Sequence, residues 1–492
     1  MSELTKSAEL FQDVEPSLET WREQEKIALE LMQIVGELRF DKSIELILFR
    51  RNIHDSRPSE VINNHLFAKD YSGQPVSVYM SLQIAVAISK LNLAPARIDV
   101  GTLATEWVAE KHNYVNLNAF IADRLNHFVG QDKMRLVAKD VVLYGFGRIG
   151  RIAARRLIEE TGKGEQLRLR AIVVRAQMKD RREELEKRAA LLQKDSVHGH
   201  FHGTVVIDFE TDELIINGNR VKIIFASHPN EIDYTAYGIK DALVIDNTGV
   251  WRDKENLSQH LRPGIDRVLF TAPGKGIPNI VYGVNHESLD VANEAVVCAA
   301  SCTTNAIVPV LEVINKAFGV ERGHIETVHS YTNDQNLLDN FHKKERRGRA
   351  AALNLVITST GAADAVAKVI PELAGKLTGN AIRVPTPNVS LAILNLSLRK
   401  ATSVKEVNAV MREASLHGAL VEQIMYSTSK ELVSSDCVSA TAALIYDSPA
   451  TIISDDKKNV TLYCWYDNEY GYTCQVLRLA KHIAEVRRLM YY

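Results

Sequence analysis

The first 137 residues carry apolar side chains at the spacing of one face of a helix. Within residues 18–38 the apolar positions recur mostly at steps of three and four, or their sums, as on one side of an α-helix. Similar patterns follow Asp41, run over residues 79–91 and 117–128, and begin after Asp99, a residue type that caps helices. Pro58, Gly73 and Pro75 are expected to separate the helices. The pattern predicts an all-helical extension of about four to six helices over residues 1–137.

From Asp140 onward the pattern changes to short β-rich runs that alternate with helical segments. The runs are residues 141–145, 170–174, 221–225, 242–246 and 267–271. Such alternation is typical of a parallel sheet with crossover helices. After Cys302 the strands become longer and are interrupted less regularly by helices, which predicts a second, α+β domain with a mixed or antiparallel sheet and helices on one side. The overall fold class is therefore α/β.

Composition and charge narrow the classes of function. The 492 residues are 46% hydrophobic and carry a formal charge of -2, so no global field favours nucleic acid or an anionic membrane. The start, MSELTKSAEL, does not show the pattern of a secretory signal, and the apolar stretch 295–314 is broken by Ser301-Cys302-Thr303-Thr304-Asn305. We expect a cytoplasmic protein with neither nucleic-acid nor membrane partners.

The cysteines and histidines give no sign of a disulfide framework or a metal site. The number of cysteines is odd, and none forms a CxxC pair; they are Cys298, Cys302, Cys437, Cys464 and Cys474. The alternating histidines of residues 198–202 are expected to be structural, and no metal is predicted. The Lys/Arg-rich run over residues 175–188 is expected to be a solvated helix face.

A glycine motif marks a candidate nucleotide site. Gly145-Phe146-Gly147-Arg148-Ile149-Gly150 follows a strand and opens a helical stretch, so backbone amides can approach a pyrophosphate; the alternative is a tight turn needed only for packing. The next strand ends at Val174 and is followed by Arg175-Ala176-Gln177, where an acid usually binds the ribose 2′-hydroxyl of NAD. Arginine in that place favours NADP. The alternative is that Arg175 faces solvent and that Asp180 or backbone groups serve NAD.

A cysteine and a histidine form the candidate catalytic pair. Cys302 precedes a helix-like apolar segment, and a thiol at a helix N-terminus has a lowered pKa. His329 follows 27 residues later on a strand-like segment and can act as general base toward the thiol. The alternative is a structural role, which is the more frequent one for an isolated cysteine or histidine.

A series of short motifs follows in a fixed order along the chain: VVLYGFGRIGR, DSVHGHF, VIDNTGVW, YGVNH, ASCTTN, TVHSYTNDQ, RAAALN, TSTGAA, PELAGKLTG, AIRVPTPNVS, LVSSD and WYDNEYGYT. These motifs and their order resemble those of the phosphorylating glyceraldehyde-3-phosphate dehydrogenase family. The resemblance covers residues 138–492, and the first 137 residues lie outside the usual length of the family. It implies a Rossmann NAD(P)-binding domain over 138–301 that is completed by a C-terminal helix in 468–492, and a catalytic domain over 302–467.

The resemblance also implies roles for individual residues. Cys302 is the nucleophile that forms a thioester, and His329 is its base. Arg383 and Thr332 bind the phosphate of glyceraldehyde 3-phosphate, and the attacking inorganic phosphate is received by Ser301, Thr303, Thr360 and Gly361. The cofactor-binding positions are Gly145, Gly147, Arg148, Ile149, Gly150, Arg175, Thr271, Asn468 and Tyr472.

Departures from the family pattern cluster at the adenosine end of the cofactor. NAD-linked members carry Asn-Asp where this chain has Arg175-Ala176, an arginine where it has Ser227, and Leu-Pro where it has Asn340-Phe341. We therefore expect use of NADP, or of both NAD and NADP, in preference to NAD alone.

The resemblance implies a homotetramer that works in glycolysis or gluconeogenesis. Two alternatives remain open at this stage. One is a dehydrogenase of erythrose 4-phosphate that uses water as acyl acceptor. The other is a scaffold or regulatory protein in which the N-terminal extension binds a protein partner.

Overall fold

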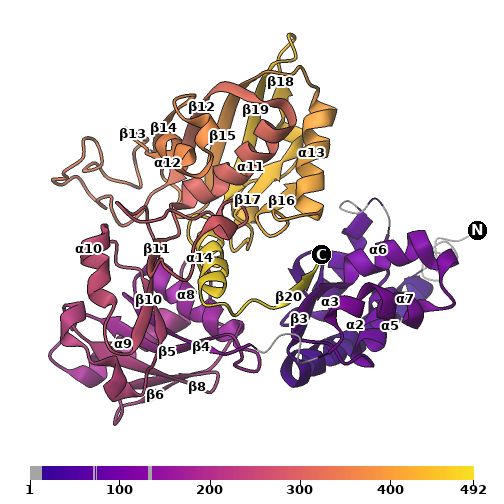
Figure 1. Ribbon diagram of the computed structural model, residues 1–492, viewed down its shortest axis with the longest axis horizontal. Coiled ribbons are helices and arrows are strands. Elements are labelled where there is room, and N and C mark those ends of the chain that lie inside the picture. Colours follow the sequence, from indigo (N-terminus) through magenta and orange to yellow (C-terminus); the bar gives the residue numbers. More distant parts are fainter. Residues whose placement is uncertain (1–13, 70–72, 74, 131–135) are drawn as a thin grey trace, which may run out of the picture. The chain divides into compact units, whose positions relative to one another are not determined.

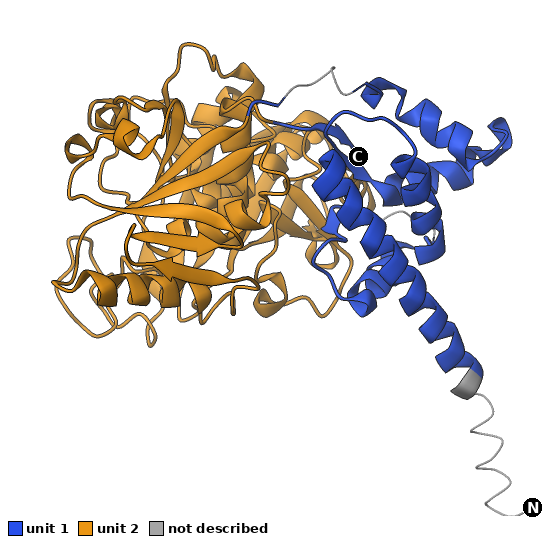
Figure 2. Ribbon diagram, turned by 90° about the horizontal axis from the view of Figure 1, so that it is seen from below, with its two compact units in different colours: residues 1–137, 487–492 blue, residues 138–486 orange. Residues whose placement is uncertain are grey.

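The computed structural model describes residues 14–69, 73, 75–130 and 136–492, which fall into two compact units (Figures 1 and 2). The first unit joins the chain up to Val137 with Arg487–Tyr492, and the second is Ala138–Val486. The start MSELTKSAEL, on which the sequence prediction about export rests, lies outside the described residues. Within the described part of the chain, no helix is long and apolar enough to cross a membrane.

The helices of the N-terminal unit follow the apolar pattern closely. They are α2 (Val14–Lys42), α3 (Pro58–Leu66), α5 (Val78–Ser89), α6 (Val100–Glu110) and α7 (Leu117–Arg124). In α2 the face formed by Ala28, Leu31, Val35 and Leu38 is fully buried, as the spacing of these residues predicts. The predicted cap at Asp99 is confirmed, because its carboxylate accepts hydrogen bonds from the first amides of α6.

The N-terminal unit is not entirely helical, and in this respect the sequence prediction is wrong. It contains a four-stranded sheet in the order β2-β1-β3-β20, formed by β1 (Ile44–Leu48), β2 (Arg51–Asn52), β3 (Ala96–Asp99) and β20 (Leu489–Tyr491). A short run such as IELIL has no alternation that separates a buried strand from a helix. The fourth strand comes from the other end of the chain, so no local pattern within residues 1–137 shows it.

The end of the chain is anchored in this sheet. β20 pairs in parallel with β3, and the Leu489 amide donates to the Pro95 carbonyl at 3.2 Å. Side chains on either side add further contacts: Arg488 pairs with Glu45 at 3.3 Å, and the Tyr491 hydroxyl donates to Glu106 at 2.5 Å. The helix predicted within 468–492 is therefore shorter, α14 (Tyr470–Ile483), and the last six residues belong to the N-terminal unit.

The larger unit begins with an eight-stranded sheet in the order β11-β10-β9-β4-β5-β8-β7-β6. Its strands are β4 (Lys139–Tyr144), β5 (Leu167–Val174), β6 (Val205–Asp208), β7 (Glu213–Ile216), β8 (Asn219–Phe225), β9 (Ala242–Asp246), β10 (Ile265–Phe270) and β11 (Val296–Cys298). The predicted parallel strands are confirmed, and an antiparallel hairpin, β6 and β7, extends the sheet at one edge. One apolar core joins this sheet to α8 (Arg148–Glu159), α9 (Arg181–Gln193) and α14.

The second sheet of this unit is mixed, as predicted, and has the order β13-β14-β12-β15-β19-β17-β16. Its strands are β12 (Val320–Ser330), β13 (Val356–Thr358), β14 (Leu377–Val384), β15 (Ser390–Leu398), β16 (Ile424–Ser427), β17 (Leu444–Asp447) and β19 (Asn459–Tyr466), and β18 (Ile452–Ile453) pairs with β19. Three helices share one apolar core with it, namely α11 (Cys302–Phe318), α12 (Ala362–Val369) and α13 (Val404–Leu416).

Removal of Arg487–Tyr492 is expected to destabilise the N-terminal unit selectively. The deletion removes the β20 pairing and the partly buried side chains Leu489 and Tyr491, which is worth about 2–4 kcal/mol of unfolding free energy. Hydrogen exchange should accelerate in β1 and β3 and stay unchanged in α14, which serves as the internal control. Unchanged protection of β3 would show that β20 contributes nothing to this sheet.

Candidate active site

Cys302 lies at the first position of α11. Ser301 caps this helix, because its hydroxyl accepts a hydrogen bond from the Thr304 amide at 3.0 Å. The Cys302 side chain is partly buried, whereas the other four cysteines are buried and unpaired. The helix start that the sequence predicts for Cys302 is therefore present, and its thiol lies where backbone amides of the first turn are free to donate.

His329 and Arg383 are brought to Cys302 by two neighbouring strands. β12 and β14 pair in parallel, with His329 opposite Arg383. The Cys302 Sγ lies 3.6 Å from His329 Nε2. On the other side of the ring, Nδ1 lies 2.7 Å from the Ser330 carbonyl oxygen, which also accepts a hydrogen bond from the Arg383 guanidinium at 2.8 Å. Nδ1 also lies 2.9 Å from Arg383 Nη1, which can only donate, whereas the carbonyl can only accept. A proton on Nδ1 serves the carbonyl and leaves the lone pair of Nε2 for the thiol, and this is the tautomer that a base at Cys302 requires.

Burial controls the ionisation of this pair. It lowers the pKa of His329 to about 3, and the nearby charges of Arg383 and Arg347 act in the same direction. Burial also raises the pKa of the Cys302 thiol, although the charge of Arg383 and hydrogen bonds with Thr303 oppose that shift. The sequence predicts a lowered thiol pKa from the helix N-terminus; in the folded chain burial outweighs that effect. At neutral pH the two groups are a thiol and a neutral imidazole.

Tyr466 is a member of the site that sequence reasoning missed. Its hydroxyl lies 2.9 Å from the Thr303 hydroxyl and 2.7 Å from the Thr327 hydroxyl, so it joins the first turn of α11 to β12. Its ring stands edge-on to the His329 imidazole with centroids 6.0 Å apart. The only sequence signal is its position within the segment WYDNEYGYT. A tyrosine at the end of a strand does not by itself indicate a functional site.

Asn468 and Tyr472 are connected to the same site through the backbone. The Ser390 hydroxyl donates to Asn468 Oδ1 at 2.8 Å and accepts from the Ser330 amide at 3.2 Å. The hydroxyl of Tyr472 donates to the carbonyl of Ala300 at 3.0 Å. Tyr472 therefore supports the turn that presents Cys302, while Asn468 is held in a fixed orientation next to β12.

The glycine motif has the geometry that a pyrophosphate needs. Gly145 has φ +96°, which favours glycine, and Gly147 caps α8. A Cβ on Gly150 would lie 2.2 Å from the Gly145 carbonyl oxygen, whereas a Cβ on Gly147 would meet no atom within 4 Å. The turn is thus closed toward the protein and open at the helix N-terminus, so these residues fit a dinucleotide.

The side chain of Arg148 is committed to ion pairs. Its guanidinium binds Glu469, with Nε donating at 2.9 Å, and it also pairs with Asp195. Glu469 in turn pairs with His198, at 3.1 Å. Only the backbone of Arg148 and Ile149 is left at the helix N-terminus for a phosphate. Glu469 and Asp195 were not singled out from the sequence, and His198 has the structural role expected of it.

The charged run over residues 175–188, predicted to be a helix face, is helical only in its second part. Residues 175–180 form a loop, and α9 begins only at Arg181. The loop is held by Glu184, which is 3% exposed and accepts hydrogen bonds from the Gln177 and Met178 amides. Arg175 is exposed.

Thr271, the residue expected near the nicotinamide, directly follows β10. Its hydroxyl donates a hydrogen bond to the Asp246 carbonyl at 3.0 Å.

The residues expected to bind phosphate differ in how their polar groups are used within the protein. The Arg383 Nε is buried and has no hydrogen-bond partner. The Ser301 and Thr303 hydroxyls already bond within the protein. Gly361 caps α12, and Thr360 accepts from the Ala362 amide at 3.2 Å. Thr332 follows β12, and no interaction joins Thr332, Thr360 or Gly361 directly to Cys302 among the described residues.

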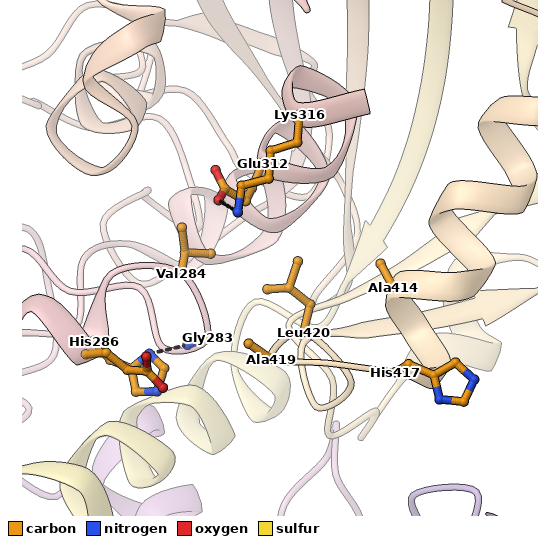
Figure 3. Close-up of a pocket in the computed structure, with 10 residues that line it drawn as sticks. Gly283, Val284, His286, Glu312, Lys316, Ala414, His417, Ala419 and Leu420 are labelled. Carbon is orange, nitrogen blue, oxygen red and sulfur yellow. Dashed lines mark hydrogen bonds and ion pairs between the residues drawn. The ribbon is translucent and has the colours of Figure 1, made fainter. Parts of the chain in front are cut away.

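A separate cavity of about 290 Å³ lies between α11 and α13 (Figure 3). Its lining residues Glu312 and Lys316 follow Cys302 by ten and fourteen positions on α11, which places them roughly 15 Å and 21 Å away along the helix. They form an ion pair at 2.5 Å, and the Gly283 amide donates to His286 Nδ1. This cavity is therefore no part of the Cys302 site. No cluster of metal-ligating side chains occurs among the residues that the structure describes.

The pH dependence of Cys302 alkylation tests the electrostatics of this site. Because burial raises the thiol pKa and Arg383 lowers it, the alkylation rate of the wild type should rise with a midpoint above about 8.5, the ordinary thiol pKa. In Arg383→Gln the midpoint should move higher still. Arg349→Gln, which removes an exposed arginine paired with Asp339, is the control and should not move it. A wild-type midpoint below the ordinary value would show that the helix N-terminus outweighs burial.

Comparisons with known proteins agree with this geometry. Residues 139–254 match the family model described as glyceraldehyde 3-phosphate dehydrogenase, NAD binding domain, and residues 301–468 match that of the C-terminal domain. A glyceraldehyde-3-phosphate dehydrogenase-like protein of Pseudomonas aeruginosa (strain UCBPP-PA14) is 50% identical over 461 residues, or 93% of this chain and 98% of its own length. Since residues 138–492 number only 355, this match extends into the N-terminal unit.

Other relatives match about 70% of the chain. The glyceraldehyde-3-phosphate dehydrogenase of Clostridium pasteurianum is 39% identical over 71% of this chain and 99% of its own length. Glyceraldehyde-3-phosphate dehydrogenase 1 of Bacillus cereus is 40% identical over 69% of this chain and 96% of its own length. The chain belongs to the glyceraldehyde-3-phosphate dehydrogenase family of oxidoreductases.

Proposed function

We propose that the chain catalyses the phosphorylating oxidation of D-glyceraldehyde 3-phosphate to 1,3-bisphosphoglycerate with NAD(P), through a thioester on Cys302. The observation that carries the proposal is the 3.6 Å contact between Cys302 Sγ and His329 Nε2, beside the guanidinium of Arg383. A nucleophile, a base and a cation within one site are the groups that acyl transfer from an aldehyde requires.

The first step is attack of sulfur on the aldehyde carbon. The thiol proton moves to His329 Nε2 as the C–S bond forms, because both groups are neutral before the reaction. The imidazolium returns this proton to the aldehyde oxygen, which gives a neutral thiohemiacetal. Its hydroxyl proton then moves back to His329 Nε2 while the hydrogen at C1 leaves as hydride, which leaves a thioester on Cys302 and a protonated imidazole. The nicotinamide of the bound dinucleotide supplies the hydride acceptor.

Inorganic phosphate completes the reaction. Its oxygen attacks the thioester carbon and the C–S bond breaks, which releases an acyl phosphate and returns the thiolate to receive a proton from His329. Arg383, with an unpartnered Nε, and Thr332 are proposed to bind the phosphate of the substrate. The amides at the starts of α11 and α12, with Ser301, Thr303, Thr360 and Gly361, are proposed to receive the attacking phosphate.

The proposed cofactor site runs along the carboxyl ends of the first sheet. Gly145, Gly147 and Gly150 would admit the pyrophosphate to the backbone of Arg148 and Ile149. Thr271, Asn468 and Tyr472 would stand at the nicotinamide end, Asn468 as a direct partner and Tyr472 through its support of Ala300. At the adenosine end, Arg175 favours NADP or dual use over NAD alone, because no acid directly follows Val174 at the strand tip.

We infer a homotetramer, and exposed apolar side chains support this assembly. Several large apolar residues after β12 are more than half exposed in the single chain, which is unusual unless another surface covers them. They are Leu337 79%, Leu338 73%, Phe341 86%, Leu353 81%, Leu355 71% and Ile357 57%.

We also propose a cytoplasmic location, because the five unpaired cysteines fit a reducing compartment.

A substitution among the exposed apolar residues tests the proposed tetramer. Leu338→Glu should lower the native mass from about four chains to fewer in analytical ultracentrifugation. An unchanged mass would assign these residues another role.

Initial rates test the proposed reaction. Oxidation of glyceraldehyde 3-phosphate should depend on inorganic phosphate with NAD, NADP or both, and Cys302→Ser should lose that rate by several orders of magnitude because its hydroxyl is a far weaker nucleophile. Cys437→Ser, which alters a buried cysteine elsewhere in the same unit, is the matched control and should keep it.

The same assay separates the rival functions. A rate with erythrose 4-phosphate that does not need phosphate would favour the hydrolytic relative. Absence of any rate with either sugar and either cofactor would contradict the proposed function and favour a non-catalytic role for the chain.

A further inference from the structure

The ends of β5 and β8 lie side by side at the adenosine end of the proposed cofactor site. Val174 pairs with Phe225, and the Ala226 amide donates to the Val174 carbonyl at 3.0 Å. Arg175 and Ser227 therefore emerge from neighbouring strands at the same edge of the sheet, where strands are about 4.8 Å apart. In a dinucleotide-binding sheet the adenosine ribose lies above this edge.

An acidic residue that is distant in sequence reaches the same edge. Glu231 is exposed and lies at the end of a short 3-10 turn, Pro229–Glu231. Its Oε2 accepts a hydrogen bond from the Ser227 amide at 2.8 Å, so the turn folds the carboxylate back onto the end of β8. Glu231 stands 56 positions after Arg175 in the sequence, which is why no local motif shows the two residues together.

Arg175 and Glu231 act on a common neighbour. Tyr144 is the last residue of β4 and directly precedes the glycine turn, and its hydroxyl is buried without a hydrogen-bond partner. Burial raises the pKa of Tyr144, the charges of Asp246 and Glu231 add to that shift, and Arg175 opposes it. The two opposite charges therefore lie within electrostatic range of one point beside the pyrophosphate turn.

Both charged groups are available to a ligand. No ion pair joins Arg175 to Glu231 in the described part of the chain, and the Arg175 guanidinium has no partner there. The neighbouring arginines of α9 are engaged: Arg181 stacks on the Phe225 ring at 3.5 Å, and Arg188 donates to Glu184 at 3.0 Å. Glu231 keeps one carboxylate oxygen unused by the Ser227 amide.

We propose that Glu231 is a cofactor-specificity residue that takes the place of the acid missing after Val174. In this inference, which rests on the proposed dinucleotide binding, Glu231 accepts a hydrogen bond from the adenosine 2′-hydroxyl of NAD and repels the 2′-phosphate of NADP. Arg175 attracts that phosphate. The balance of the two charges sets the ratio of affinities for the two dinucleotides and gives dual use in the wild type.

Equilibrium binding to the full-length protein tests this inference. Dissociation constants for NAD and NADP would be measured by isothermal titration calorimetry with the wild type and with Glu231→Gln, which retains an oxygen acceptor for the Ser227 amide. The ratio of the NAD to the NADP dissociation constant should rise about tenfold, through weaker NAD binding and tighter NADP binding. Arg175→Gln should change the ratio in the opposite direction by weakening NADP.

A matched variant controls for the loss of charge. Glu210→Gln removes an exposed acid from the turn between β6 and β7, on the same sheet, and should leave the ratio unchanged. An unchanged ratio in Glu231→Gln, or equal weakening of both dinucleotides, would overturn the inference. Because binding is measured without substrate, a shifted ratio supports the role of Glu231 even if the proposed oxidation is not observed.

Discussion

The parallel pairing of β12 with β14 aligns His329 with Arg383, and the geometry of the Cys302 site depends on that alignment. Both side chains share the Ser330 carbonyl oxygen, which fixes the imidazole ring and directs Nε2 to the thiol. A shift of β14 by one residue in this register would turn Arg383 to the other face of the sheet, away from His329. Tyr466 strengthens the arrangement, because its hydroxyl connects β12 to the first turn of α11.

Burial gives this arrangement its chemical character. It keeps the imidazole neutral far into the acid range and keeps the thiol protonated at neutral pH. Nucleophile and base therefore meet as uncharged partners, and the charge that develops during the reaction arises beside Arg383, which is already in position. The adenosine end of the cofactor site differs, since its charged groups Arg175 and Glu231 are exposed.

The sequence predicts those features of the structure that depend only on residues close together in the chain. The helix start at Cys302, the cap at Asp99 and the glycine turn at residues 145–150 each need only neighbouring residues, and the sequence predicts all three. Local sequence patterns do not indicate contacts between segments that are distant in the chain. β20 joins a sheet formed more than 380 positions earlier in the chain, and Tyr466 reaches Thr303 across 163 positions. The thiol pKa was misjudged for the same reason, because the burial of Cys302 is a property of the folded chain.

The central claim is that Cys302 carries an acyl group that inorganic phosphate removes. Mass spectrometry of the intact protein, mixed with glyceraldehyde 3-phosphate and oxidised dinucleotide in phosphate-free buffer, tests it most directly. The account predicts a phosphoglyceroyl adduct that maps to Cys302, requires the dinucleotide and disappears when phosphate is added. Absence of the adduct while the dinucleotide is reduced, or an adduct on another residue, would contradict it.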